Sequence, residues 1–591
     1  MFKKSKNIAF VVLLILLALP AFQHITKLVS VKPLDGDFVI APRPPITWKG
    51  WLSGDFQTQF DNYIEDHIGF RSFFVRLNNQ TDFSLFRKAN ADGVVVGKDR
   101  MLFEYDYIQA YTGKDFIGKN TIRKKLNRVK FLQKYLKENF DIDFVIIFEP
   151  SKARFYPELI PDHYLADGVG LSNYEYFTQE AKNLGVRFID YNKYYNQLKG
   201  TKPYPLYPKW GIHWSEYGMS FVADSLVKYL ENLRGIDLPE MKLDNLKVTT
   251  HLEDSDYDVG KTMNLLWRLP HSEVAYPQYS FDGGGNKTRP MVLTIADSYY
   301  WNIFNTRLPK NLFANEAFWY FNAKVYPDSY FGTKWVRDVD LRQEVEKQDI
   351  IMLSVTERFL YKFDWGFVDD VFKLYAPSCS GDLIYDFANG IKADASWFSK
   401  IQKKAQKQGI PLEDALIDEA TFRAITEDFE TYLSWYGLDH YKKIILNATE
   451  WKEAVNKKAA EQGISFDEML TIDADYTFKN DHPAANQKYH LLQKNINAIK
   501  SDREWLKVVG EKASIYFMDT LEMVQIDAEY MANQELGKLS ADELKIQALE
   551  KQIRQDPAWL ELVTKKAADQ GKSLDQMIRE DAEFMVNQEK K

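Results

Sequence analysis

Two residues, His213 and Ser298, have the residue types and the sequence context needed for nucleophilic catalysis. His213 lies between two tryptophans just ahead of a helical pattern at 221–233, and an imidazole titrates close to neutral pH, so it can act as a general base. Ser298 follows Asp297 at the end of the apolar run 290–296, which predicts a buried strand. Because α/β enzymes expose nucleophiles at the carboxyl ends of such strands, we expect Ser298 to be a nucleophile and His213 its base.

Helical and strand patterns alternate around these two residues, which predicts an α/β domain with a parallel sheet. Apolar runs at 144–148, 186–190 and 349–355 are typical of buried strands, and the periodic, polar-faced segments 121–140 and 173–184 predict helices. Parallel strands end at a common edge of the sheet, so the residues that follow them come together. The sequence therefore predicts a sheet flanked by helices, with the catalytic edge at the carboxyl ends of its strands.

Length and composition limit the classes of function. A chain of 591 residues exceeds one hydrophobic core, so we expect at least two domains. The net charge of −8 and the pI of 5.8 argue against nucleic-acid binding, which requires a basic surface. Cys379 is the only cysteine and the sequence has no glycine-rich phosphate loop, so we expect no disulfide, no metal site and no cofactor.

The first 30 residues have the pattern of an export signal. Three lysines precede the uncharged, apolar run 8–22. A basic start followed by such a run is typical of a secretory signal peptide or a signal anchor. We expect residues 1–30 to be a retained anchor, or a signal peptide if it is cleaved, with the basic end in the cytoplasm and residues 31–591 exported.

A repeat array follows a Pro-, Ser- and Gly-containing stretch that ends the α/β region at residue 376. A tryptophan recurs every 54 residues, and Lys, Ala, Gly, an acidic residue and an aromatic residue follow it at fixed distances, with Phe517 in place of one Gly. Four copies, the last one shortened, predict an all-α domain of helical hairpins over 377–591. The four tryptophans are Trp397, Trp451, Trp505 and Trp559.

The repeated residues of this array are those that cap and pack helices. The repeated acidic residue could ligate a metal, but capping and packing account for the pattern better. No histidine recurs at a fixed position of the repeat. We therefore expect the array to dock a protein partner or a polymer, and to contribute no catalytic group.

Taken in order, the motifs of residues 48–375 resemble the AlgJ/AlgX-like polysaccharide O-acetyltransferases, whose catalytic domain is SGNH-hydrolase-like. The resemblance implies an α/β, SGNH-like domain over 31–376. It rests on Trp48 with Gly69-Phe70-Arg71, Val94-Val95-Val96-Gly97-Lys98-Asp99, Pro150-Ser151-Lys152 with Tyr156-Pro157-Glu158, Tyr207 with His213-Trp214, and Asp297-Ser298.

The resemblance assigns Ser298 as the nucleophile and His213 as the base. The family's acid, two residues before the histidine, falls on Gly211, which has no side chain. Asp297 and Glu149 are candidates to replace it, because each follows or ends a predicted strand. The acid of such a triad orients the histidine and stabilises its cation.

The resemblance also implies substrate contacts. Aromatic residues near the site can stack on sugar rings, although packing in the core explains any one of them equally well. The residues expected to bind substrate are Trp214, Tyr207, Tyr299 and Arg71.

The implied function is transfer of an acetyl group, through an acyl-serine, onto hydroxyls of an extracellular or cell-envelope polysaccharide. The implied partners are this polysaccharide and a membrane-bound acyl-transfer protein, and the implied location is the periplasmic side of the inner membrane. Two alternatives stay open. The same Ser and His could hydrolyse acetyl esters of carbohydrates, or Gly211 could mark a non-catalytic protein that binds polysaccharide or serves as a scaffold.

Overall fold

The computed structural model describes residues 2–36 and 39–588, and it divides into two compact units, Met1–Val371 and Phe372–Lys591. Met1 of the predicted export signal and residues 589–591 of the predicted array lie outside the described residues. The division falls in helix α16 (Phe367–Tyr375), a few residues before the boundary expected at residue 376.

A six-stranded sheet forms the centre of the first unit, in the order β4-β3-β10-β7-β8-β9. All neighbouring strands are parallel except β8 and β9, so the expected parallel sheet is confirmed. Its three middle strands are buried at every residue, as parallel strands covered on both faces must be. The strands are β3 (Asp143–Glu149), β4 (Phe188–Asp190), β7 (Val292–Ala296), β8 (Ala317–Tyr320), β9 (Lys324–Tyr326) and β10 (Ile350–Thr356).

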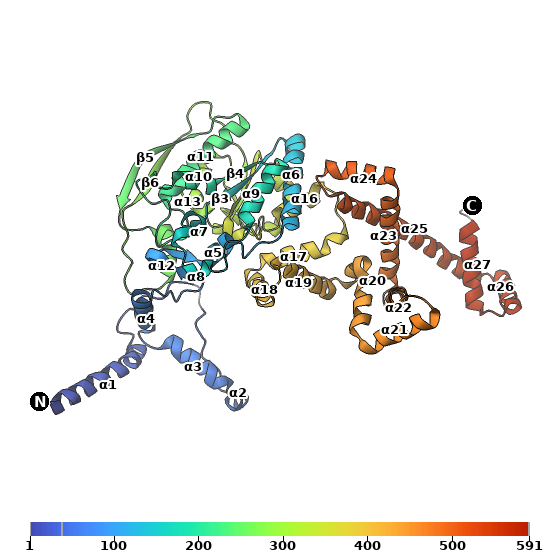
Figure 1. Ribbon diagram of the computed structural model, residues 1–591, viewed down its shortest axis with the longest axis horizontal. Coiled ribbons are helices and arrows are strands. Elements are labelled where there is room, and N and C mark those ends of the chain that lie inside the picture. The colour runs from blue at the N-terminus through green and yellow to red at the C-terminus, as the bar shows by residue number, and fades with distance from the viewer. Residues whose placement is uncertain (1, 37–38, 589–591) are drawn as a thin grey trace. The chain divides into compact units, whose positions relative to one another are not determined.

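Helices cover both faces of this sheet (Figure 1). Side chains of β3 point alternately to the two faces, as the two-residue period of a strand requires. Val145 and Ile147 belong to the main core with α10 (Tyr191–Leu198) and α11 (Glu216–Arg234). On the other face, Phe144 packs against α16 and Phe148 against α9 (Asn173–Leu184), which lies on α6 (Lys119–Phe140). The predicted helices are therefore confirmed.

The carboxyl ends of β7 and β10 lie side by side and are joined by Asp297. Its Oδ2 accepts hydrogen bonds from the backbone N–H and the hydroxyl of Thr356, both at 2.8 Å. Ser298 follows immediately, and α13 (Tyr300–Asn305) begins two residues later. The strand-to-helix turn expected for Ser298 is thus present at the middle of the sheet.

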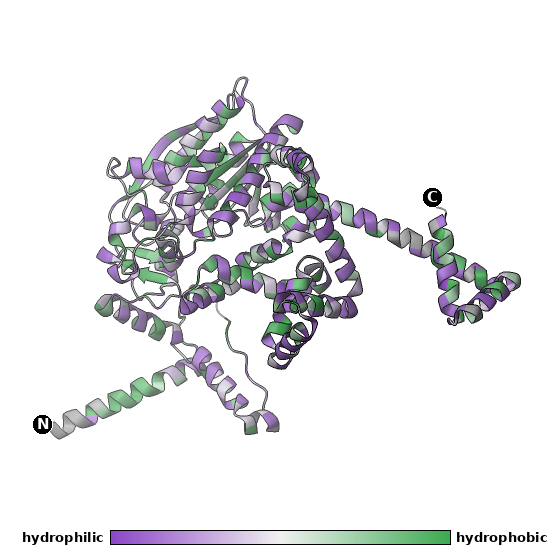
Figure 2. Ribbon diagram, turned by 45° about the vertical axis from the view of Figure 1, so that its right-hand side comes forward, coloured by the Kyte–Doolittle hydropathy of each residue, from purple (hydrophilic) through white to green (hydrophobic). Residues whose placement is uncertain are grey.

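Among the described residues before 94, the structure has four helices: α1 (Phe2–Thr26), α2 (Trp48–Ser53), α3 (Asp55–His67) and α4 (Arg71–Phe86). In α1, the apolar run expected from the sequence forms a continuous hydrophobic band (Figure 2). None of the described helices combines the length and the apolar character that crossing a membrane requires.

The second unit consists of helices, as expected for the array, but each of the first two copies has three helices. In the first copy, α18 (Ala395–Gln408) and α19 (Leu412–Glu427) form the expected hairpin, and α20 (Phe429–Asn447) follows. The second copy repeats this with α21 (Thr449–Gln462), α22 (Phe466–Asp481) and α23 (Pro483–Ser501). The expectation of two helices per copy omitted the last third of the 54-residue period, which has no fixed-position motif but is long enough for a helix.

In the third copy, one long helix replaces two separate ones. Helix α24 (Arg503–Ile515) is followed by α25 (Thr520–Gln555), which runs on to the start of the fourth copy, α26 (Pro557–Gln570) and α27 (Leu574–Gln588). All four copies turn through a left-handed residue after the first helix, with φ of 65°, 67° and 66° at the glycines and 53° at Phe517. The prediction that this position is a helix C-cap is confirmed for the three glycines.

The repeated acidic residue pairs with the repeated lysine of the same copy. A lysine near the end of the first helix therefore holds the second helix of its own hairpin. The pairs are Lys404–Glu419 at 3.6 Å, Lys458–Asp473 at 2.7 Å, Lys512–Asp527 at 2.5 Å and Lys566–Asp581 at 3.0 Å.

The repeated aromatic residue, which we expected to pack a hairpin on itself or on the next one, is exposed in every copy. It sits on the outer face of the second helix, whereas the neighbouring small residue faces inward. Its exposed fraction is 61% at Phe422, 68% at Tyr476, 67% at Tyr530 and 63% at Phe584.

Candidate active site

The structure brings His213 and Ser298 together across 85 residues of sequence. His213 Nε2 lies 2.8 Å from Ser298 Oγ, within hydrogen-bond distance. His213 precedes α11, and Ser298 follows β7, so two rigid elements hold the two side chains. This is the geometry in which an imidazole can take the proton of a serine hydroxyl.

The second nitrogen of the imidazole contacts a carboxylate that the sequence did not indicate. Asp258 Oδ2 lies 2.5 Å from His213 Nδ1, and its other oxygen, Oδ1, accepts a hydrogen bond from the backbone N–H of Ile212 at 3.0 Å. Asp258 is the first residue of the short helix α12 (Asp258–Thr262). One carboxylate therefore fixes both the imidazole and the backbone beside it, and it directs the proton-accepting nitrogen towards Ser298.

The segment that carries Asp258 occupies the space beside Gly211. A Cβ added to Gly211 would lie 2.8 Å from the carbonyl oxygen of Asp256, closer than real contacts allow. The absence of a side chain at position 211 therefore leaves room for the segment that brings the carboxylate of Asp258 to His213. Sequence reasoning missed Asp258 because the Asp254–Asp258 segment has no strand or helix periodicity and lies 45 residues from His213.

The two carboxyls proposed as replacements, Asp297 and Glu149, have other contacts. Asp297 directs Oδ1 to the backbone N–H of Tyr299 at 3.0 Å and Oδ2 to Thr356. Glu149 accepts a hydrogen bond from Ser354 on the neighbouring strand, and burial raises its pKa well above the ordinary value. We expected Asp297 or Glu149 to orient His213, and the structure corrects this expectation. Both residues lie at the carboxyl edge of the sheet, as their strand-end positions predicted, but their side chains bind residues of β10 instead.

The pKa of His213 is set by two opposed effects. Burial of the imidazole favours the neutral form and lowers the pKa, whereas the hydrogen bond and the charge of Asp258 favour the cation. The charges of Glu104 and Asp297 act in the same direction as Asp258. Together the carboxylates outweigh burial, so the pKa of His213 is raised above its ordinary value, which strengthens it as a base.

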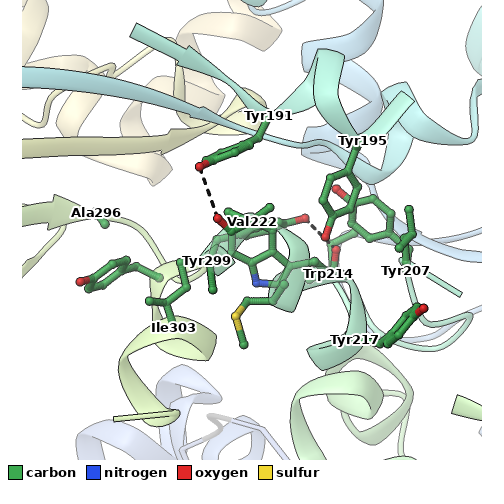
Figure 3. Close-up of a cluster of buried hydrophobic side chains, with 14 of the residues drawn as sticks. Tyr191, Tyr195, Tyr207, Trp214, Tyr217, Val222, Ala296, Tyr299 and Ile303 are labelled. Atoms are coloured by element: carbon green, nitrogen blue, oxygen red, sulfur yellow. Dashed lines mark hydrogen bonds between the residues drawn. The ribbon is translucent and has the colours of Figure 1, made fainter. Parts of the chain in front are cut away.

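Three of the four residues expected to bind substrate lie in the core instead. Trp214 and Tyr299 are fully buried and Tyr207 is 1% exposed, so none can stack on a sugar (Figure 3). They support the histidine: the Tyr299 ring lies 4.9 Å from the His213 ring, and its hydroxyl donates to the carbonyl of Ile212 at 2.9 Å. The sequence could not separate these roles, because aromatic residues serve both packing and stacking.

The fourth, Arg71, lies at the start of α4. It forms an ion pair with Asp66 of α3 at 2.8 Å. The pocket that contains Ser298 is lined by other residues, so the substrate contact expected of Arg71 is also corrected.

A pocket of about 630 Å³ opens over His213, Asp258 and Ser298. The residues that line it include acidic side chains, one arginine, two asparagine amides and one tryptophan ring. Such a mixture suits a ligand that is rich in hydroxyl groups. The burial of Glu216 and the like charge of Glu253 raise the pKa of Glu216. The remaining polar and aromatic wall residues are Glu216, His251, Glu253, Ser255, Arg268, Trp301, Asn302 and Asn305.

A buried lysine holds the loop in front of His213. Lys152 Nζ donates hydrogen bonds to the carbonyls of Pro208 at 2.7 Å and Gly211 at 2.5 Å. Its side chain is fully buried, and burial lowers the pKa of its ammonium to about 7. Lys152 therefore fixes the backbone from which the imidazole projects.

Comparison with known families agrees with this fold. Residues 94–280 match the model of the SGNH hydrolase-like domain of acetyltransferase AlgX. This region is therefore similar to the SGNH hydrolase-like domain of AlgX-type acetyltransferases. The AlgX-type match includes His213 and Asp258 and ends before Ser298.

Solved structures similar to this chain were found, whereas a search of curated proteins gave no match. The O-acetyltransferase domain of Pseudomonas putida AlgJ has 15% identity, covers 48% of this chain and 99% of its own, and gives a TM-score of 0.32. AlgX of Pseudomonas aeruginosa has 15% identity, with 47% and 67% coverage and a TM-score of 0.30. PatB1 of Bacillus cereus has 13% identity, with 46% and 99% coverage and a TM-score of 0.26.

Proposed function

We propose that this protein is an O-acetyltransferase that carries an acetyl group on Ser298 and passes it to a hydroxyl of a polysaccharide. The observation that carries the proposal is the chain of contacts Asp258–His213–Ser298, at 2.5 and 2.8 Å. The AlgX-type family match of residues 94–280 supports the reaction class. The alternative of a non-catalytic scaffold rested on Gly211 and on the repeat array, and the contact of Asp258 with His213 answers the first of these grounds.

The proposed reaction has two steps. In the first, His213 Nε2 takes the proton of Ser298 Oγ, the oxygen attacks the acetyl carbonyl of the donor, and the donor's leaving oxygen departs with that proton. In the second, His213 takes a proton from a sugar hydroxyl, whose oxygen attacks the acyl-serine. The sugar ester is released and Ser298 regains its proton. Asp258 stabilises the imidazolium in both steps.

Each step forms an oxyanion that needs hydrogen-bond donors. The backbone N–H of Tyr299, one residue after Ser298, is engaged by Asp297. We assign the donor role to the carboxamide of Asn302, which lies one helical turn beyond Ser298 and lines the same pocket. Trp301 and Arg268 on the pocket wall are the proposed contacts for the sugar.

The test is formation of the acyl-enzyme. The chain is incubated with 4-nitrophenyl acetate, and its intact mass is measured at short times. We expect one added acetyl group in the natural protein and none in Ser298→Ala, with the fold of both checked by circular dichroism. An acetyl group on Ser298→Ala would refute the assignment, and an acetyl-serine that water removes while added oligosaccharides stay unmodified would favour the esterase alternative.

We further propose that residues 31–591 act outside the cytoplasm, attached by the N-terminal segment to the periplasmic side of the inner membrane. The basic start and the apolar run of α1 support this orientation. We also place a membrane-bound acyl-transfer protein upstream as the source of the acetyl group. A C-terminal reporter that is active only after export should be active, and cytoplasmic activity of such a reporter would reverse the topology.

We propose that the helical array docks the polymer or a protein partner and leaves the chemistry to the first unit. The exposed repeated aromatics Phe422, Tyr476, Tyr530 and Phe584 support a docking role. Removal of residues 377–591 should preserve turnover of 4-nitrophenyl acetate and reduce acetylation of the polymer. Loss of ester turnover in a folded truncation would show that the array completes the site.

A further inference from the structure

Helices α2 and α3 carry a line of exposed and half-buried aromatic rings that the proposed chemistry does not use. Trp51, Phe56, Phe60, Tyr63 and His67 form this line, which we call the aromatic stripe. Their neighbouring ring centroids are 5.6, 5.5, 6.2 and 4.1 Å apart in that order. The last four are spaced by four, three and four residues, so they share one face of α3.

These two helices have no core of their own. Within α2 and α3, all of whose residues the structure describes, no residue is buried. Trp48 is 84% exposed and Leu52 81%, and Trp51, Phe60 and Ile64 are exposed as well. Helices of 6 and 13 residues are too short to be stable in water without packing, so this apolar face needs a covering surface.

The neighbouring helix α1 indicates what that surface is. Residues 10–17 are all exposed and all apolar, and eight consecutive residues cover every side of a helix. A protein groove would cover one side of such a helix, whereas lipid surrounds it. The apolar run therefore fits a bilayer better than a protein partner.

The ends of α1 and α3 are fixed to one another. His24 Nδ1 donates to the carbonyl of His67 at 2.6 Å, and Gly69 approaches Pro20 so closely that its missing Cβ would lie 2.1 Å from the Pro20 carbonyl oxygen. The aromatic stripe and the apolar run thus start from the same corner of the unit. A surface that receives α1 is within reach of the aromatic stripe.

We propose that the aromatic stripe is a lipid-binding surface, which lies in the bilayer interface beside α1. Tryptophan and phenylalanine are residues that settle at this depth. The opposite face of α3 is acidic, with Asp55, Asp61 and Glu65 and no lysine or arginine, so it faces water. Binding should therefore come from apolar contact and gain nothing from anionic lipid. This adds a second contact to the proposed attachment through α1.

The test is a two-by-two set of full-length variants mixed with phosphatidylcholine vesicles and analysed by flotation. The stripe variant is Trp51→Ser with Phe60→Ser, and the α1 variant is Leu13→Asn with Leu17→Asn. The control, Asn62→Ser with Glu65→Ser, alters the polar face of α3. Since α2 and α3 bury no residue, we expect the stripe variant to keep its circular-dichroism spectrum and its turnover of 4-nitrophenyl acetate.

We expect the stripe variant to lower the partition coefficient on the order of ten-fold, in the natural and in the α1-variant background alike. The control should change it little, and adding phosphatidylglycerol to the vesicles should not raise it. An unchanged partition of the stripe variant in both backgrounds would overturn the proposal and leave the stripe to a protein partner. A change in mass by light scattering with unchanged partition would also overturn it, and would assign the stripe to contact between copies.

Discussion

Asp258 Oδ2 lies 2.5 Å from His213 Nδ1, on the side of the imidazole opposite to Ser298. The contact joins the start of α12 to the loop before α11, so the acid and the base come from separate segments of the chain. Since Oδ1 of the same carboxylate also holds the Ile212 N–H, the position of the ring depends on Asp258 twice.

Replacing Asp258 with Asn should therefore reduce turnover with little change in fold. The amide can donate to Nδ1 and so place the ring proton on Nε2, where it blocks proton transfer from Ser298. We expect kcat on 4-nitrophenyl acetate to fall roughly 10²- to 10⁴-fold. Asp224→Asn, an exposed carboxylate of α11 paired with Lys228, is the matched control. Equal kcat values for the two variants would contradict the role of Asp258.

The pH dependence of kcat/KM should also depend on the contact between Asp258 and His213. His213 acts as a base only when neutral, so kcat/KM should rise with pH through the pKa of His213, which lies above its ordinary value. In Asp258→Asn the carboxylate no longer opposes burial, so the pKa falls and the acid limb of the residual activity moves to lower pH. A limb that stays in place in the variant would show that another group sets it.

Gly211→Ala should destabilise the first unit, because the new Cβ would collide with the Asp256 carbonyl at 2.8 Å. We expect a loss of about 1–3 kcal/mol in the free energy of unfolding, the usual range for an overpacked site. Urea unfolding followed by tryptophan fluorescence measures it. Gly235→Ala is not a suitable control because Gly235 has a positive φ, whereas Gly170→Ala has ordinary space around its Cβ and should cost less.

Lys152→Met should leave the carbonyls of Pro208 and Gly211 unpaired and cost roughly 1–3 kcal/mol of stability for each buried acceptor. The pKa of Lys152 is about 7 in the folded protein, below its ordinary value, so the unfolded chain binds more protons above pH 7. Stability of the natural protein relative to Lys152→Met should therefore increase as pH rises from 7 towards 10. A pH-independent difference between the two would contradict the buried position of this amine.

In the array, replacing an exposed or a buried aromatic residue of the same helix with alanine should change the free energy of unfolding by different amounts. Tyr476 of α22 is exposed, while Phe478 on the same helix is fully buried. Tyr476→Ala should change the free energy of unfolding by less than about 0.5 kcal/mol, as surface substitutions do. Phe478→Ala should cost about 3–5 kcal/mol through the cavity it leaves. A large loss in Tyr476→Ala would restore the packing role expected from the sequence.

Sequence reasoning located the parts of this molecule that local patterns encode. The run before Ser298 and the helix after His213 were predicted because burial and periodicity leave a clear signal. Asp258 was not, because a carboxylate in an irregular segment becomes a partner only through the tertiary fold. The buried state of Trp214 and Tyr299 was equally hidden, since aromatic rings pack in cores as well as on sugars.

The repeat array is a second case in which the sequence predicted local structure but not the contacts between residues. The 54-residue period and its turns were visible, because Gly409, Gly463 and Gly571 mark helix ends. The recurrence of lysine and of an acidic residue was visible too, yet nothing in a linear sequence states that they meet. Exposure of the recurring aromatic contradicted the expectation because recurrence alone does not distinguish packing from binding.

The pairing of each repeated lysine with the acid of its own copy has a consequence for the history of the array. At these two positions each copy is electrically self-contained, because Lys458 meets Asp473 and Lys566 meets Asp581 inside one hairpin. Other ion pairs, such as Lys488–Glu529 and Arg579–Glu543, join neighbouring copies. Duplication or deletion of a whole copy strands no charge at the positions of the repeated lysine and its acid. A change in the number of copies would therefore leave each of these lysine–acid pairs intact inside its own hairpin.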